Sequence, residues 1–147
     1  MEAQVQRQMT VKPAGQRRQF RLLQMPRQIA PQPRQMGKIA PLALPGQTHA
    51  LHMVDINGDG LKDLVTGRRW WAHGDHGDVS PMDPPCLYWF EAKKDKAGMI
   101  SFTPHLIDDD SGVGTQFAVS DINGDGLLDI VISNKKGVFI FEQVRTD

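Results

Sequence analysis

Residues 47–147 alternate short apolar runs with polar turns that contain glycine. The runs are rich in β-branched and aromatic side chains, a composition typical of β-strands. The strands that this pattern predicts are residues 50–54, 64–66, 87–91, one strand supplied by 99–103 and 105–107 together, 117–119, 130–133 and 138–142. We therefore expect an all-β region of antiparallel sheets over residues 47–147.

Residues 1–46 follow a different pattern. They are rich in Gln, Arg, Pro and Met, and they show no sustained period of 2 or 3.6. Their six prolines exclude a long helix, because proline removes a backbone donor and clashes with the preceding turn. We expect a disordered or weakly structured basic segment with one short helix around residues 17–24.

One motif of nine residues occurs twice. Residues 55–63 read DINGDGLKD and residues 121–129 read DINGDGLLD, so that eight of nine positions are identical. Oxygen side chains occupy positions 1, 3, 5 and 9, and Ca²⁺ takes about six to eight oxygen ligands in proteins. The candidate ligands, for about two ions, are Asp55, Asn57, Asp59, the Leu61 carbonyl, Asp63, Asp121, Asn123, Asp125, the Leu127 carbonyl and Asp129.

Two alternatives to a calcium loop between strands can be compared with this motif. An EF-hand needs flanking helices and a glutamate at position 12, where this chain has Thr66 and Ile132. A plain polar turn needs only one Asn-Gly or Asp-Gly pair and not three aspartates. Carboxylates about 4 Å apart repel one another by about 4 kcal/mol at an intermediate dielectric, and a divalent cation removes this repulsion.

The two loops, each followed by a β-branched strand, a turn and an aromatic strand that ends in Glu91 or Glu142, resemble FG-GAP/VCBS repeats. These repeats form the blades of integrin-α-like β-propellers, and the resemblance covers residues 47–144. It implies calcium at both loops, a secreted or cell-surface location, and a role in adhesion or in carbohydrate or protein binding. An alternative is that the chain is a C-terminal fragment or accessory module of a secreted carbohydrate-active or sugar-oxidising enzyme.

Two blades are fewer than the four to eight that typically close a propeller. We therefore expect self-association through open blade edges, or further blades supplied by a longer protein.

Charge is divided unequally between the two parts. Residues 1–46 carry eight Lys or Arg against one acidic residue, whereas the rest carries nine against sixteen. A nucleic-acid partner is disfavoured, because the basic segment has a single aromatic residue, Phe20, for stacking on bases. The single cysteine, Cys86, forms no intrachain disulfide, and we recognise neither a membrane-spanning run nor a signal peptide.

Residues 70–85 form a polar insertion that contains Trp70, Trp71, His73, Asp75 and His76. The first interpretation is a blade-edge loop whose tryptophans pack on the sheet. The alternatives are ligand recognition by the aromatic pair, or a catalytic or second metal site. No recognised catalytic motif occurs in the chain, so we expect no enzyme activity of its own. The turn-rich segment at residues 108–114, which begins with the acidic run at 108–110, is predicted to be a solvated loop, with a carboxylate that reaches a neighbouring ion as the alternative.

Overall fold

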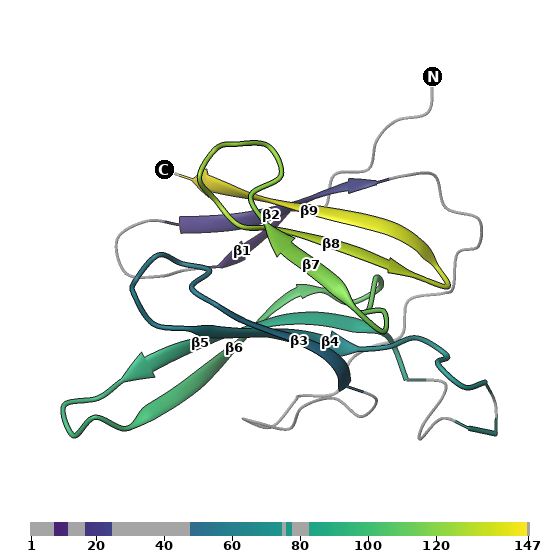
Figure 1. The fold of residues 1–147 in the computed structure, drawn as a ribbon, viewed down its shortest axis with the longest axis horizontal. Helices are drawn as coiled ribbons and strands as arrows, with labels where there is room; N and C mark the ends of the chain where they lie inside the picture. Colours follow the sequence, from purple (N-terminus) through teal and green to yellow (C-terminus); the bar gives the residue numbers. More distant parts are fainter. Residues whose placement is uncertain (1–7, 12–16, 25–47, 75, 78–82, 147) are drawn as a thin grey trace.

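A computed structural model describes residues 8–11, 17–24, 48–74, 76–77 and 83–146. Over these ranges the fold is all β, with two antiparallel sheets stacked one on the other and no helix (Figure 1). The first sheet has the strand order β3 (Thr48–Val54), β4 (Asp63–Arg68), β5 (Cys86–Lys94) and β6 (Ile100–Asp108). The second has the order β1 (Gln8–Val11), β2 (Arg17–Gln24), β9 (Gly137–Thr146), β8 (Asp129–Asn134) and β7 (Phe117–Ser120).

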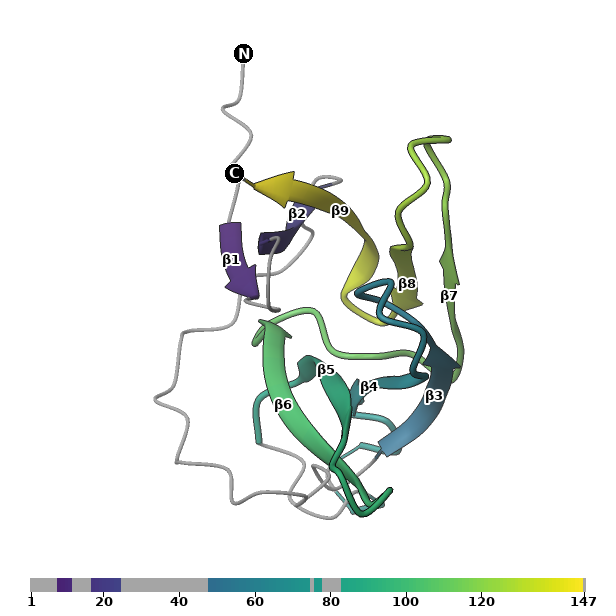
Figure 2. The ribbon, with the colours of Figure 1, turned by 90° about the vertical axis from the view of Figure 1, so that its left-hand side faces the viewer.

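The predicted all-β, blade-like architecture is confirmed. Strands β3 to β6 form a four-stranded meander in chain order, and β7, β8 and β9 repeat its first three strands in the second sheet. The two sheets do not close into a barrel, an arrangement consistent with blades of an incomplete propeller (Figure 2). We call the β3–β6 sheet the first blade and the sheet containing β7–β9 the second blade.

The fourth strand of the second blade comes from the other end of the chain. Strand β2 pairs with β9 over eight positions, from Arg17 opposite Thr146 to Gln24 opposite Phe139. The predicted short helix around residues 17–24 is therefore wrong. Phe20 and Leu22 are two residues apart and both are buried in the core, as the period of a strand requires. The other positions of residues 1–46, apart from β1, lie outside the described residues.

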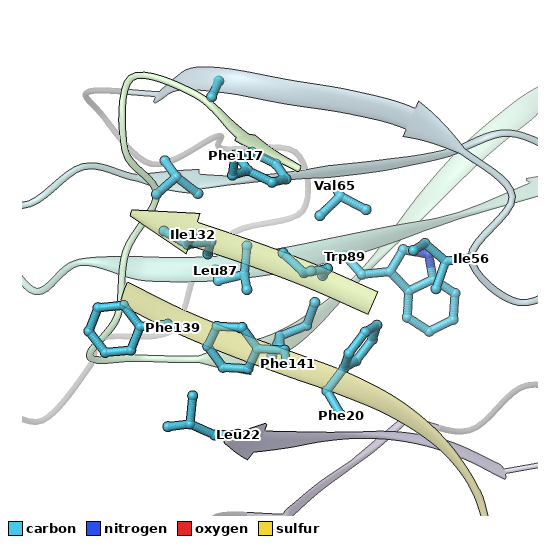
Figure 3. Close-up of a cluster of buried hydrophobic side chains, with 14 residues drawn as sticks. Phe20, Leu22, Ile56, Val65, Leu87, Trp89, Phe117, Ile132, Phe139 and Phe141 are labelled. Atoms are coloured by element: carbon cyan, nitrogen blue, oxygen red, sulfur yellow. The ribbon is translucent and has the colours of Figure 1, made fainter. Parts of the chain in front are cut away.

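The main core lies between the two sheets (Figure 3). It contains Leu87 and Trp89 from the first blade, and Ile132, Phe139 and Phe141 from the second. Aromatic and aliphatic side chains of this size each contribute about 1.5–3 kcal/mol when they leave water. The contact between the sheets is therefore the principal stabilising feature of the pair.

The two blades contact each other through non-equivalent faces. Phe90 pairs with Leu64 and Phe141 pairs with Ile130, so these two phenylalanines occupy the same position in their blades. Phe141 faces the core between the sheets, whereas Phe90 belongs to a separate cluster on the opposite face of the first blade. The front of one blade thus packs on the back of the next, as in successive propeller blades and unlike a symmetric sandwich.

The first strands of the two blades also meet. The Nε2 atom of His52 in β3 lies 2.7 Å from the backbone oxygen of Phe117 in β7, and the centroids of the two rings are 4.7 Å apart. Each repeated loop begins where one of these strands ends, so this contact fixes the relative position of the two loops. Among the described residues, no helix is long and apolar enough to cross a membrane.

Candidate metal loops

Both repeated loops connect the first and second strands of a blade, as predicted. The loop at residues 55–62 joins β3 to β4, and the loop at residues 121–128 joins β7 to β8. Gly60 and Gly126, at position 6, have φ values of +89° and +81°. Only glycine adopts this backbone region readily, and this is the physical reason for the residue at that position.

The aspartate at position 1 binds the backbone of its own loop. One carboxylate oxygen of Asp55 accepts hydrogen bonds from the N–H groups of Gly58 (2.6 Å) and Asp59 (3.0 Å), and the other accepts from Gly60 (2.8 Å). These three donors converge on one carboxylate and offset part of its negative charge. The first loop is therefore folded around Asp55.

Asp121 has the same role in the second loop. It accepts from the N–H groups of Gly124 (2.7 Å), Asp125 (3.2 Å) and Gly126 (2.8 Å). The Gly126 N–H has the largest effect on this carboxyl and lowers the Asp121 pKa below its ordinary value. The Asp121 carboxylate is thus held in its charged form, which is the form that binds a cation.

The side-chain oxygens at positions 3 and 5 accept hydrogen bonds from backbone N–H groups of their own loop. Asn57 Oδ1 accepts from the Asp59 N–H at 2.9 Å, and Asp59 Oδ1 accepts from the Leu61 N–H at 2.8 Å. The Asn57 amide also donates to Asp59 Oδ2 at 3.0 Å. The corresponding distances at Asn123 and Asp125 are 2.9, 2.8 and 3.2 Å. The structure therefore brings the side chains of positions 1, 3 and 5 together in both loops.

The aspartate at position 9 is buried in both loops. Asp63 and Asp129 are 0% exposed, and both of their oxygens accept backbone hydrogen bonds. Asp63 accepts from Ile56 N at 3.1 Å and from Ala92 N, in the third strand, at 2.8 Å. Asp129 accepts from Ile122 N at 3.0 Å and from Gln143 N at 2.9 Å. The ninth residue thus ties the loop to the third strand of its own blade.

Burial raises the pKa of Asp63 above its ordinary value, and the hydrogen bonds from Ala92 and Ile56 only partly oppose it. The indole of Trp89 also lowers the pKa of Asp63, although its N–H makes no hydrogen bond. A cation near this carboxylate would favour its charged form. Without a cation nearby, burial disfavours the charged form of Asp63.

A buried glutamine links the second blade to the first loop. The side-chain amide of Gln143 donates to the Ile56 carbonyl at 3.0 Å. Sequence reasoning did not identify Gln143, because its partner is 87 residues away in the chain. No signal in the motif itself points to this contact.

The donor set fits a hard cation such as Ca²⁺, because it offers carboxylate and amide oxygens and no sulfur or imidazole. Each carboxylate oxygen has two lone pairs, so a backbone hydrogen bond leaves capacity for a metal. Within the described part of the chain, no group of three or more His, Cys, Asp or Glu side chains is arranged so that it could hold a metal ion. Ligation by the ten candidate groups stays a prediction.

The acidic run at residues 108–110 is not simply solvated. Asp108 is buried and accepts from the N–H groups of Asp110 and Ser111 within its own turn. Asp110 forms a salt bridge with Lys136. The predicted solvated loop is wrong for Asp108 and for residues 111–114, which are buried. The Asp108 carboxylate lies inside the turn because it satisfies backbone donors there.

The insertion after β4 is described only in part. Trp70 and Trp71 lie against the turn between β8 and β9, and Asp83 forms a salt bridge with Arg68 at 3.2 Å. Asp75 and residues 78–82 lie outside the described residues. The alternative of a catalytic or second metal site at His73, Asp75 and His76 therefore stays untested.

Comparison with known proteins gives one family match. Residues 113–138 match the model of the FG-GAP repeat. No curated protein and no solved structure matches the chain. The matched segment contains β7, the second repeated loop and β8, which are the elements whose geometry is described above. The chain therefore carries an FG-GAP repeat.

Proposed function

We propose that this protein is a calcium-binding, non-catalytic β-propeller-repeat module for adhesion or for binding a carbohydrate or protein ligand. The observation that carries the proposal is the identical hydrogen-bond pattern of the two loops, one of which lies in the FG-GAP repeat. Both loops place three oxygen-bearing side chains on alternate residues of a glycine-bent turn. Such a design suits an oxygen-seeking cation.

Calcium would be held by positions 1, 3 and 5 of each loop, by the carbonyl at position 7, and by the aspartate at position 9. The bound ion would supply positive charge that offsets repulsion among the carboxylates. Asp63 and Asp129 connect each site to a third strand, so binding would also stabilise the blade. The ion has a structural role in this proposal and takes part in no reaction.

The proposed location is extracellular or at the cell surface. Extracellular calcium modules bind with dissociation constants of about 10⁻⁴–10⁻³ M, in keeping with the calcium concentration outside cells. FG-GAP repeats are typical of extracellular proteins, and the proposed location follows from the matched segment.

Urea unfolding in calcium, in magnesium and in chelator tests the metal part of the proposal. At a calcium concentration about 100 times the dissociation constant, each site stabilises the folded state by about 2.7 kcal/mol. Asp59→Ala should lose the part of this stabilisation that calcium in the first loop contributes. Asp95→Ala is a matched control, because Asp95 also accepts two turn N–H groups, from Ala97 and Met99, but lies outside both loops. Equal stability in calcium and in chelator would reject calcium binding.

A further inference from the structure

Trp71 combines an exposed side chain with an unusual backbone. Its side chain is 40% exposed, and its φ is +46°. Among the described residues it is the one non-glycine residue with a positive φ. Bulky side chains rarely adopt this region, and residues held there by the surrounding structure cluster at binding sites.

The second blade holds this backbone in place. Lys135, in the turn between β8 and β9, donates from Nζ to the carbonyls of Trp71 (2.9 Å) and Ala72 (3.1 Å). The same ammonium group lies 5.2 Å from the centroid of the Trp71 ring. One lysine therefore fixes both the peptide carbonyls and the indole, through hydrogen bonds and a cation–π contact.

Lys136 and Trp70 form a second lysine–tryptophan contact beside that of Lys135 and Trp71. Lys136 is held by Asp110, and its Nζ lies 5.8 Å from the Trp70 ring. The Trp70 and Trp71 rings are 6.0 Å apart and inclined by 38°. Two aromatic rings from the first blade are thus fixed by two consecutive lysines from the second. We call Trp70, Trp71, Lys135 and Lys136 the aromatic–lysine cluster.

A core role does not account for this cluster. Trp89 shows what a core tryptophan looks like in this chain, since it is buried in the packing between the sheets. Trp71 is instead 40% exposed, and its backbone adopts a disfavoured conformation. Exposed, rigidly held aromatic groups beside polar groups are typical of ligand sites.

The charges beside the rings select among ligands. An exposed aromatic face attracts cations, but two ammonium groups already lie near these rings and disfavour a cationic ligand. Lys135 has three N–H donors, and two of them bind the carbonyls of Trp71 and Ala72. The third is available for an anionic group of the ligand.

We propose that the aromatic–lysine cluster binds an acidic sugar, with the C–H face of a uronate ring against Trp71 and its carboxylate on Lys135. This inference rests on the proposed function as a ligand-binding module and names the place and the ligand class. A sugar ring offers an apolar face of the size of an indole, and its carboxylate matches the remaining Lys135 donor. The site needs both blades, because each supplies half of it.

Tryptophan fluorescence of the full chain in calcium tests the proposal, with a galacturonic acid trimer as the acidic probe and a galactose trimer as the neutral one. The acidic trimer should give a saturable change at least about tenfold tighter than the neutral trimer, a difference of about 1.4 kcal/mol. Raising the salt concentration should weaken binding, because an exposed ammonium–carboxylate contact is screened.

Variants assign the signal. Calorimetric titration of Trp71→Ala, which lacks the fluorescent reporter, should show no binding of either trimer. Lys135→Gln should weaken binding of the acidic trimer more than binding of the neutral trimer, since Lys135 contacts the acidic group and also positions Trp71. Met99→Ala is the control, because Met99 is 69% exposed in the distant turn between β5 and β6. The circular dichroism of each variant establishes that it is folded. Equal affinity for both trimers, unchanged binding by Trp71→Ala, or no saturable response would overturn the proposal. A separate calcium titration distinguishes failure of this site from failure of the calcium proposal.

Discussion

The side-chain amide of Gln143 donates to the backbone carbonyl of Ile56 at 3.0 Å and so joins β9 of the second blade to the first repeated loop. Gln143 N also binds Asp129 at 2.9 Å, and Ile56 N binds Asp63 at 3.1 Å. These contacts form one buried hydrogen-bonded path between the last aspartates of the two loops. The loops are therefore physically connected across the blade interface.

Replacing Gln143 by leucine should destabilise the protein by about 1–3 kcal/mol, because it removes the buried hydrogen bond from the Gln143 amide to the Ile56 carbonyl. Urea denaturation measures this change. Gln116→Leu is the matched control, since Gln116 is exposed on the loop before β7 and should change stability by less than about 0.5 kcal/mol. Equal effects of the two substitutions would show that the amide contact contributes nothing specific.

Phe20→Ala should destabilise the protein by about 3–5 kcal/mol, the usual range for a phenylalanine removed from a core. The side chain comes from β2, so the result measures how firmly this strand belongs to the second blade. Thermal unfolding and sedimentation should show lower stability and more self-association, because a loosened β2 uncovers the edge of β9. A variant with the stability and the sedimentation behaviour of the parent would place β2 outside the folded core.

Alkaline pH should destabilise the fold through Cys86 and Tyr88. Burial raises the Cys86 pKa from 9.0 to about 11 and the Tyr88 pKa from 10.0 to about 12. The folded protein therefore retains protons that the unfolded chain has lost, so this stabilisation is complete below about pH 9 and is lost as the pH rises toward 12. Cys86→Ala should flatten the decline between pH 9 and 11 in a series of urea titrations. An identical decline in the parent and the variant would exclude Cys86 as its source.

Two aspartates of the second loop should respond differently to substitution by asparagine. Asp129→Asn should lower stability by about 1–3 kcal/mol even in chelator, because an amide cannot accept from both Ile122 N and Gln143 N with two oxygens. Asp125→Asn should lower stability mainly when calcium is present, since Asp125 is exposed. Urea unfolding in both conditions separates the two effects. Similar losses of stability for both variants in chelator would contradict a stabilising role for the hydrogen bond between Asp129 and Gln143 N of β9.

The local elements could be predicted because short-range chemistry determines them. The spacing of oxygens and glycines identified both loops, and the apolar runs identified the strands on either side of them. The pairing of β2 with β9 could not be predicted, because it joins segments more than 100 residues apart and a proline-rich surrounding masks the alternation of Phe20 and Leu22. The Gln143 contact was missed for the same reason, since it depends on how one blade stacks on the next.

Calorimetric titration of the full chain with calcium measures metal binding by the two loops. We expect saturable binding at about two sites, with Asp59→Ala and Asp125→Ala each retaining one, and weak competition by Mg²⁺, which prefers a smaller octahedral site. Absence of saturable calcium binding by the parent protein, or unchanged binding by both variants, would contradict this expectation.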